Sequence, residues 1–324
     1  NFGQEKQGIK WAKQALLISQ NQDVSLFVKN NALASEINSL HKQGKIFEAI
    51  KSQEDLMVNY KKLYNNVKTG EMLTIDEQDY VEYAYGISMN NLALKYLESG
   101  IKFDEIENLL LKSINLISND NPNDIMLHYP YYNLGNYYSA INNGKKSKKF
   151  FLKSIEIIEL NISKEDPSLL ILPVLALTQR YLYENNFTEA SNLIERAENI
   201  FTNNKSINRI SHLALMRTKA DIYYVSGQYN KAIDILEPLI ESSKTDSEIL
   251  NIKSTLLKNY YYTREFDFVV SKALEIEQLI YKQPIKTMDS LSYLQQVANY
   301  YGYLEDLDPD NSFFSSKRKY QRSK

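Results

Sequence analysis

The sequence has 324 residues, 43% hydrophobic and 24% charged, which is ordinary for a globular protein with a sizeable core. It contains no cysteine, so disulfides, thiolate nucleophiles and thiolate metal sites are excluded. The formal net charge is -2, and five basic groups lie within 317–324, so the rest of the chain is acidic and does not suggest a nucleic-acid groove. No run of about 18 apolar residues occurs, so we expect no membrane span.

Glycine and proline are scarce, with 10 and 7 copies, which favours long helices. The chain starts at Asn1 with neither Met nor a hydrophobic leader, so we expect a mature or trimmed form. The compartment stays open between the cytoplasm and, if a signal peptide was removed, the periplasm or exterior. The oligomeric state also stays open.

Taken in order, the chain begins with residues 1–23, which carry Ile9, Ala12 and Leu16 at helical spacing. We interpret them as the second helix of an incomplete repeat. Residues 24–283 follow as an array of helix pairs. Residues 284–306 are predicted to form one amphipathic capping helix, and the basic segment 307–324 is predicted to be disordered.

The clearest unit of the array is 131–158, which is predicted to form two helices joined by a tight turn at Asn143 and Gly144. Two helices approach closely where a small side chain lies opposite a large one. Gly135 on the first helix and Ser147 on the second are the small partners, and Phe151 is one of the large ones. We therefore predict a close helix crossing at these residues.

The same pattern recurs along the array. Its small position on the second helix falls at Ala49, Ile106, Ser147, Ala190, Ala232 and Val269. The successive spacings are 57, 41, 43, 42 and 37 residues, so the middle of the chain repeats about every 42 residues. A long loop at 65–74 accounts for the first spacing. Six helix pairs are predicted.

The pattern resembles the tetratricopeptide repeat (TPR) family, over roughly 24–281. The segments NNLALKY at 90–96 and PYYNLGNYY at 130–138 are more similar to the 42-residue variant of the repeat found in kinesin light chains and related bacterial arrays than to the usual TPR. The resemblance implies an all-α right-handed superhelix, with an extra helix at each end of the six pairs. In two repeats the position of the small residue is occupied by a larger one, Ile106 or Val269. Ile101 is interpreted as a one-residue insertion.

Capping signals support the helix boundaries. Capping boxes are predicted at Thr74 to Glu77 and at Thr245 to Glu248. Asp166 precedes a first-turn proline, Pro167, as an N-cap would.

No catalytic constellation is present in the sequence. The three histidines, His41, His128 and His212, fall in different repeats, and no nucleotide-binding, hydrolase or metalloprotease motif occurs. The acidic group around Asp76 is interpreted as a helix start that favours the helix dipole, not as a metal site. We expect no enzyme activity, no cofactor and no metal.

The first helix of each pair is expected to line a continuous groove. Its groove-facing positions are rich in Asn and Tyr, which suit an extended peptide because amides both donate and accept, and Tyr adds contact area at low entropic cost. By resemblance alone, Asn91 and Asn133 match the kinesin-light-chain position that holds a peptide main chain. The candidate binding residues are Asn91, Tyr132, Asn133, Asn136, Gln179, Tyr183, Arg217, Asp221, Tyr224 and Lys258.

The sequence therefore predicts a non-enzymatic scaffold that binds a protein or peptide, in a bacterial sensing, regulatory or assembly system. The alternative is the ligand-binding part of a peptide-pheromone regulator that resembles the Rap and Rgg-like proteins. No nucleic acid is expected to bind through the array.

Overall fold

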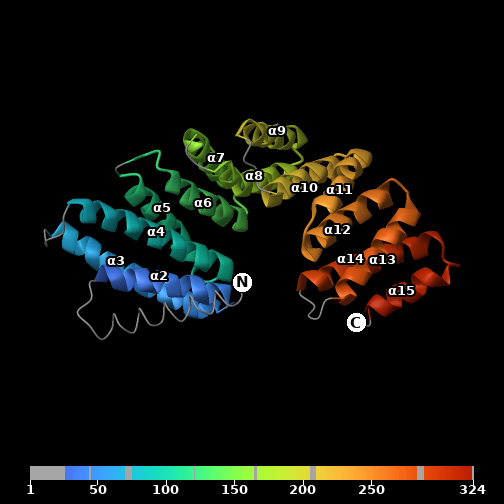
Figure 1. The fold of residues 1–324 in the computed structure, drawn as a ribbon, viewed down its shortest axis with the longest axis horizontal. Coiled ribbons are helices and arrows are strands. Elements are labelled where there is room, and N and C mark those ends of the chain that lie inside the picture. Colours follow the sequence, from blue (N-terminus) through green and yellow to red (C-terminus); the bar gives the residue numbers. More distant parts are fainter. Residues whose placement is uncertain are drawn as a thin grey trace. The chain divides into compact units, whose positions relative to one another are not determined.

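The computed structural model describes residues 26–43, 45–69, 75–119, 121–163, 166–204, 209–282 and 288–322, and within these ranges every regular element is a helix. The chain divides into two compact units, with the boundary between Asp166 and Pro167. Each unit is built from pairs of helices joined by short turns (Figure 1). The predicted all-α fold is confirmed.

The described residues of the first unit form three pairs. They are α2 (Leu26–Lys42) with α3 (Ile46–Lys68), α4 (Ile75–Ser99) with α5 (Phe103–Ile117), and α6 (His128–Ala140) with α7 (Gly144–Asn161). A 3-10 turn, η1 (Ile125–Leu127), leads into α6. The buried core runs through all three pairs and includes Leu92, Ile106 and Leu134.

The second unit begins with a 3-10 turn, η2 (Pro167–Leu170), and the part of it that the structure describes forms four pairs. They are α8 (Ile171–Tyr183) with α9 (Phe187–Asn204), α10 (Arg209–Val225) with α11 (Tyr229–Ser242), α12 (Asp246–Tyr262) with α13 (Phe266–Lys282), and α14 (Met288–Leu307) with α15 (Ser312–Arg322). Its largest buried cluster includes Leu236, Leu256 and Ile276.

The crossing of α6 and α7 shows why these residues pair. A Cβ added at Gly135 would overlap the ring of Phe151, so only glycine lets the two helices come this close. Ser147 Oγ donates to the Gly135 carbonyl at 2.9 Å, and Ser147 is fully buried. The predicted small-to-large contact is confirmed.

The turns between paired helices repeat one backbone geometry. Asn142, Asn185, Gly227 and Arg264 all have positive φ, between 57° and 75°. The residue after each donates its N–H to a tyrosine carbonyl five positions back, as in Asn143 to Tyr138, which is the helix-ending bond of a left-handed cap. In the α4–α5 turn the second helix begins seven positions after Tyr96, whereas α7 begins six positions after Tyr138, and the turn has two left-handed residues, Gly100 and Lys102, so Ile101 fits the predicted one-residue insertion.

The first helices of successive pairs lie side by side within each unit. We define the A-helix face of the first unit as the surface of α4 and α6, and that of the second unit as the surface of α8, α10, α12 and α14. Neighbouring members of each set contact one another directly. The second helices of the pairs form the other layer, so side chains on the A-helix face are held by two neighbouring repeats.

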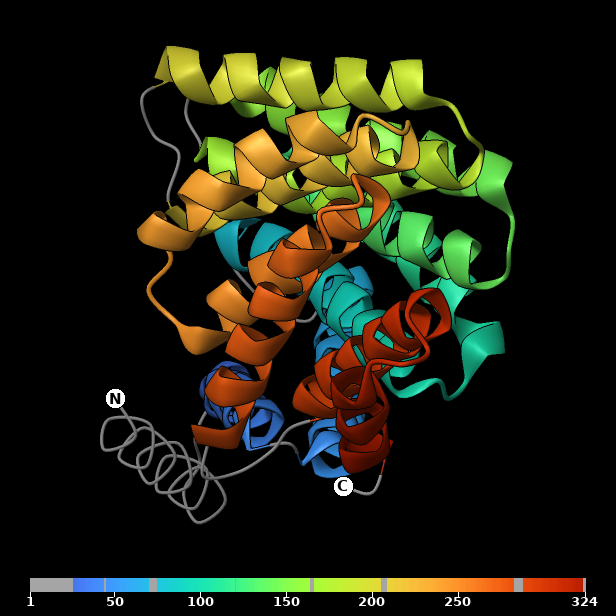
Figure 2. The same cartoon turned by 90° about the vertical axis from the view of Figure 1, so that its right-hand side faces the viewer.

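The C-terminal segment corrects one expectation. Residues 312–322 were expected to be disordered, but they form α15, which packs beside α14 (Figure 2). Lys317 Nζ donates to Glu277 at 2.7 Å, and Arg318 pairs with Glu305 at 3.1 Å. The predicted capping helix is therefore one half of a seventh pair. The basic residues that suggested a solvated tail partly neutralise acids on α13 and α14.

The remaining boundary expectations have mixed outcomes. The Thr245 to Glu248 capping box is present: the Thr245 side chain accepts from the Glu248 N–H, and the Glu248 side chain accepts from the Thr245 N–H. The loop expected from 65 begins later, because α3 continues to Lys68. The predicted N-terminal helix within 1–23, the tip of the loop at 70–74 and the Thr74 cap lie outside the described residues.

Candidate functional site

The predicted binding residues fall on the A-helix faces of both units. Asn91 lies on α4, and Tyr132, Asn133 and Asn136 lie on α6. Their six counterparts in the second unit are Gln179 and Tyr183 on α8, Arg217, Asp221 and Tyr224 on α10, and Lys258 on α12. Because the two sets belong to separate compact units, each is described as its own surface.

In the first unit the asparagines form a chain of hydrogen bonds between repeats. Asn133 is only 3% exposed, and its Nδ2 donates to Asn90 Oδ1 at 2.9 Å. Asn90 in turn donates to Asn91 Oδ1 at 3.2 Å, and Asn91 is exposed. Asn133 thus links α4 to α6, and Asn91 is the asparagine of the expected pair whose side chain faces solvent.

Amides and hydroxyls join the first helices of the second unit in the same way. Ser254 Oγ on α12 donates to Gln296 on α14, and Gln296 Nε2 donates to the Ser254 carbonyl at 3.3 Å. Tyr293 donates its hydroxyl to Asn251 Oδ1 at 2.5 Å. Polar side chains on the A-helix face therefore fix the register between repeats as well as meeting solvent.

Charged groups gather on α10 and α12. Burial raises the pKa of the Asp221 carboxyl above its ordinary value, although the nearby Arg217 and Lys258 act in the opposite direction. All three side chains are partly exposed. They give the centre of this face one more positive than negative charge when Asp221 is ionised.

Tyrosines surround these charges. The rings of Tyr224, Tyr229 and Tyr262 lie 5.0 to 5.8 Å apart, and Tyr262 is 49% exposed. Burial, together with a hydrogen bond to Tyr262, raises the pKa of Tyr224. On α8, Tyr183 is 72% exposed beneath the Arg180 guanidinium.

Tyr300 and Tyr303 on α14 belong to this aromatic surface and were not among the predicted groove residues. Tyr261 contacts both Tyr300 and Tyr303 of α14, with ring centroids 5.2 and 5.6 Å apart. Residues 284–306 are predicted only to cap the array, so no groove position is assigned to them from the sequence. Continuing the repeat register onto this helix puts Ala298 at the position of Gly135 and Tyr303 at the position that Tyr262 has on α12.

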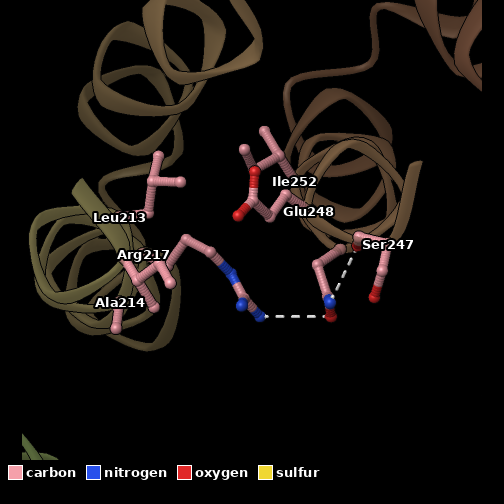
Figure 3. Close-up of a pocket in the computed structure, with 8 residues that line it drawn as sticks. Leu213, Ala214, Arg217, Ser247, Glu248 and Ile252 are labelled. Atoms are coloured by element: carbon pink, nitrogen blue, oxygen red, sulfur yellow. Dashed lines mark hydrogen bonds between the residues drawn. The ribbon is translucent and has the colours of Figure 1, made fainter. Parts of the chain in front are cut away.

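A cleft opens between α10 and α12, with a volume of about 130 Å³. Figure 3 shows Arg217 reaching from α10 toward α12, and the Glu248 side chain lying between the two helices. Arg217 Nη2 donates to Asn251 Oδ1 at 3.4 Å. The cleft is lined by Ile210, Leu213, Ala214, Arg217, Ser247, Glu248, Asn251 and Ile252.

Glu248 is held rigidly in this cleft. Its carboxylate accepts both Arg209 Nη atoms, at 2.6 and 2.8 Å, and the backbone N–H of Lys244 at 2.8 Å. The Arg209 hydrogen bonds, followed by the Lys244 N–H, lower the pKa of Glu248 to about 2. Its negative charge is therefore present at neutral pH and is fully compensated by fixed donors.

Other site chemistries find no support in the part of the chain described here. No group of three or more His, Asp or Glu side chains that could hold a metal ion occurs there. His128 is buried, with Nδ1 2.6 Å from the Ile125 carbonyl, which fits a packing role. None of the described helices is both long and apolar enough to cross a membrane.

Comparison with known proteins gives structural matches only. No family model matches the sequence, and no curated protein matches it. A kinesin light chain-type array of nearly identical TPR-like repeats from Podospora anserina is similar, with a TM-score of 0.50 at 16% identity, over 61% of this chain and 96% of that one.

Two further solved structures cover most of the chain. A tetratricopeptide repeat protein from Parabacteroides merdae has a TM-score of 0.50 at 16% identity, over 90% of this chain and 98% of that one. A Rap protein in complex with competence and sporulation factor has a TM-score of 0.50 at 12% identity, over 94% and 77%. The protein therefore has the fold of the tetratricopeptide repeat proteins, as the repeat pattern predicted.

Proposed function

We propose that this protein is a non-enzymatic scaffold that binds a partner protein or peptide on the A-helix face, chiefly that of the second unit. One observation carries the proposal: α10 and α12, which form the cleft, also carry the partly exposed Tyr224, Tyr262, Arg217, Asp221 and Lys258. Interfaces are enriched in tyrosine and arginine, and a surface kept only for solubility has no need of such large aromatic side chains.

The physical basis is a rigid, preformed surface. Tyr224, Tyr229 and Tyr262 support one another, so they lose little freedom when a partner binds. Lys258 and Arg217 supply donors to carbonyl or carboxylate oxygens. The TPR-type fold presents neighbouring repeats in register, which suits an extended peptide that crosses several helices.

The test is to select nine-residue peptides from a random library on the whole protein and to measure their affinities. Lys258→Ala and Tyr183→Ala are expected to weaken a selected peptide by about five- to tenfold, the loss typical of an interface contact. Asp234→Ala is the matched control, because Asp234 is exposed on α11, outside the A-helix face. Equal affinities for all three variants would contradict the proposal.

In the first unit, Asn91→Ala is the clean probe of binding. Asn91 is exposed, whereas Asn133 is buried and donates to Asn90, so Asn133→Ala would confuse lost stability with lost affinity. If the first unit contributes to binding, Asn91→Ala weakens the peptide; the melting temperature is measured beside it, because Asn91 Oδ1 also accepts from the buried Asn90.

A second candidate is the ligand-binding part of a peptide-responsive regulator. The similarity to the Rap protein, whose solved complex contains competence and sporulation factor, favours it. Such a receptor would show a rise of several degrees in melting temperature with one short peptide, by mass action on the folded state. A scaffold for large partners would show no such rise with peptides of five to ten residues.

A further inference from the structure

The cleft between α10 and α12 is the size of one side chain. Its volume of about 130 Å³ is well above the roughly 10–15 Å³ that a single water molecule needs. Pockets for drug-sized ligands are larger, at about 300–1,000 Å³. The apolar lining comes from Leu213, Ala214 and Ile252, with Ile210 68% exposed beside them. An aliphatic side chain of three or four carbons matches this space.

The acceptors in the cleft are already engaged. Glu248 is saturated by Arg209 and by the N–H groups of Lys244 and Thr245. Asn251 Oδ1 accepts from Tyr293 and Arg217, and its Nδ2 donates to the Ser247 carbonyl at 3.0 Å. A ligand that brings donors would therefore find little to bond.

One donor is left without a partner. Arg217 Nε is buried and has no acceptor among the described residues. A buried N–H without an acceptor is unfavourable, so a ligand oxygen at this point would be favoured. Nη2 of the same guanidinium already donates to Asn251, and the Nε–H suits a main-chain carbonyl oxygen of an extended peptide.

We propose that this cleft is an anchor subsite for one branched aliphatic residue, Leu, Ile or Val, within an extended partner peptide. The side chain fills the apolar part of the cleft, and an adjacent main-chain carbonyl accepts from Arg217 Nε. This inference rests on the proposed function and adds to it the kind of residue that a partner must carry.

The experiment uses the peptides selected on the whole protein, with fluorescence anisotropy as the readout. Selected peptides are expected to share one interior Leu, Ile or Val, and its replacement by Ala should weaken binding about tenfold. Ala214→Leu, which fills the cleft, should weaken the parent peptide to a similar extent and leave the Ala-substituted peptide unchanged. Arg217→Met should weaken both peptides.

Two further variants separate the cleft from its surroundings. Ile210 is 68% exposed, so the Ile210→Asp protein should fold normally while its preference for an aliphatic residue in the peptide falls. This variant takes the place of Ala214→Leu if the Ala214→Leu protein is unstable. Arg180→Met is the matched control, because Arg180 Nε is also buried without an acceptor but does not line this cleft. It is expected to leave the aliphatic preference unchanged.

The contrary outcomes are distinct. Peptides that bind without any aliphatic preference, or an Ala214→Leu variant that weakens parent and Ala-substituted peptides equally, would overturn the subsite and leave the proposed function standing. A different result would be that synthetic peptides bind only when the aliphatic residue is at the C-terminus with a free carboxylate. That result would overturn the assignment of a main-chain carbonyl as the acceptor of the Arg217 N–H. A library that yields no binder at all would count against the proposed function itself.

Discussion

Gly135 decides how closely α6 and α7 pack. Gly135→Ala would normally favour a helix by roughly 0.5–1 kcal/mol, but here the new Cβ overlaps the ring of Phe151. We expect a net loss of about 1–3 kcal/mol in the free energy of unfolding, measured by urea titration.

Gly302→Ala is the matched control on α14. Its Cβ would meet the flexible side chain of Arg318, with Cζ 3.1 Å away, which can shift. A Gly135→Ala protein as stable as the wild type would contradict the close crossing.

Glu248 makes stability depend on pH in the acid range. Its pKa is about 2 in the folded protein and 4.5 for the ordinary group, so the stabilisation is present above about pH 4.5 and is lost as the pH falls toward 2. We therefore expect Glu248→Gln to lower the melting temperature at pH 7 and to make little difference near pH 2.

Glu241→Gln, at an exposed position on α11, is the control for this prediction and should follow the wild type at every pH. A constant difference between wild type and Glu248→Gln from pH 7 to pH 2 would be inconsistent with the Arg209 pair as the cause.

At the scale of elements, α15 is held by charge as well as by packing. Glu277 is buried, and Lys317 donates to it at 2.7 Å. Lys317→Met removes the donor and leaves the carboxylate behind, so we expect a loss of about 1–3 kcal/mol, measured by urea unfolding.

The double variant Lys317→Met with Glu277→Gln removes both charges and should recover part of that loss. If Lys317→Met alone unfolds at the wild-type urea concentration, the contact does not hold α15. In that case the helix depends on Phe313, which packs edge-on against Tyr301 with ring centroids 6.1 Å apart.

For the whole molecule, the repeat architecture predicts which helices are destabilised by a substitution in the core. Each pair contacts mainly its neighbours, so stability is close to a sum of local terms. Leu256 is fully buried on α12, and Leu256→Ala should cost about 2–5 kcal/mol. Hydrogen exchange is expected to rise most in α10 to α14, whose side chains share that core.

Leu134→Ala is the reciprocal variant, because Leu134 is equally buried in the core of the first unit. Its effect should centre on α4 to α7. A uniform loss of exchange protection across all described helices from either variant would show that the chain unfolds as one cooperative block instead.

The sequence by itself determined the features that depend on neighbours along the chain. The 42-residue spacing, the helix pairs, the Gly135 and Ser147 contact and the Thr245 capping box all follow from helical periodicity and local hydrogen bonding. These rules act within one repeat, so they can be applied without knowing how the repeats stack. The position of Asn91 on the A-helix face follows from the same register.

Only the tertiary structure decided the features that join different repeats. Residues 312–322 contact α13 through Lys317 and Glu277, which lies 40 positions earlier in the chain. The burial of Asn133 depends on Asn90, 43 positions away. The cleft exists because α10 and α12 leave a space that their side chains do not fill, and the unpaired Arg217 Nε depends on that space. Contacts of this range follow from how repeats pack against one another, which no local pattern records.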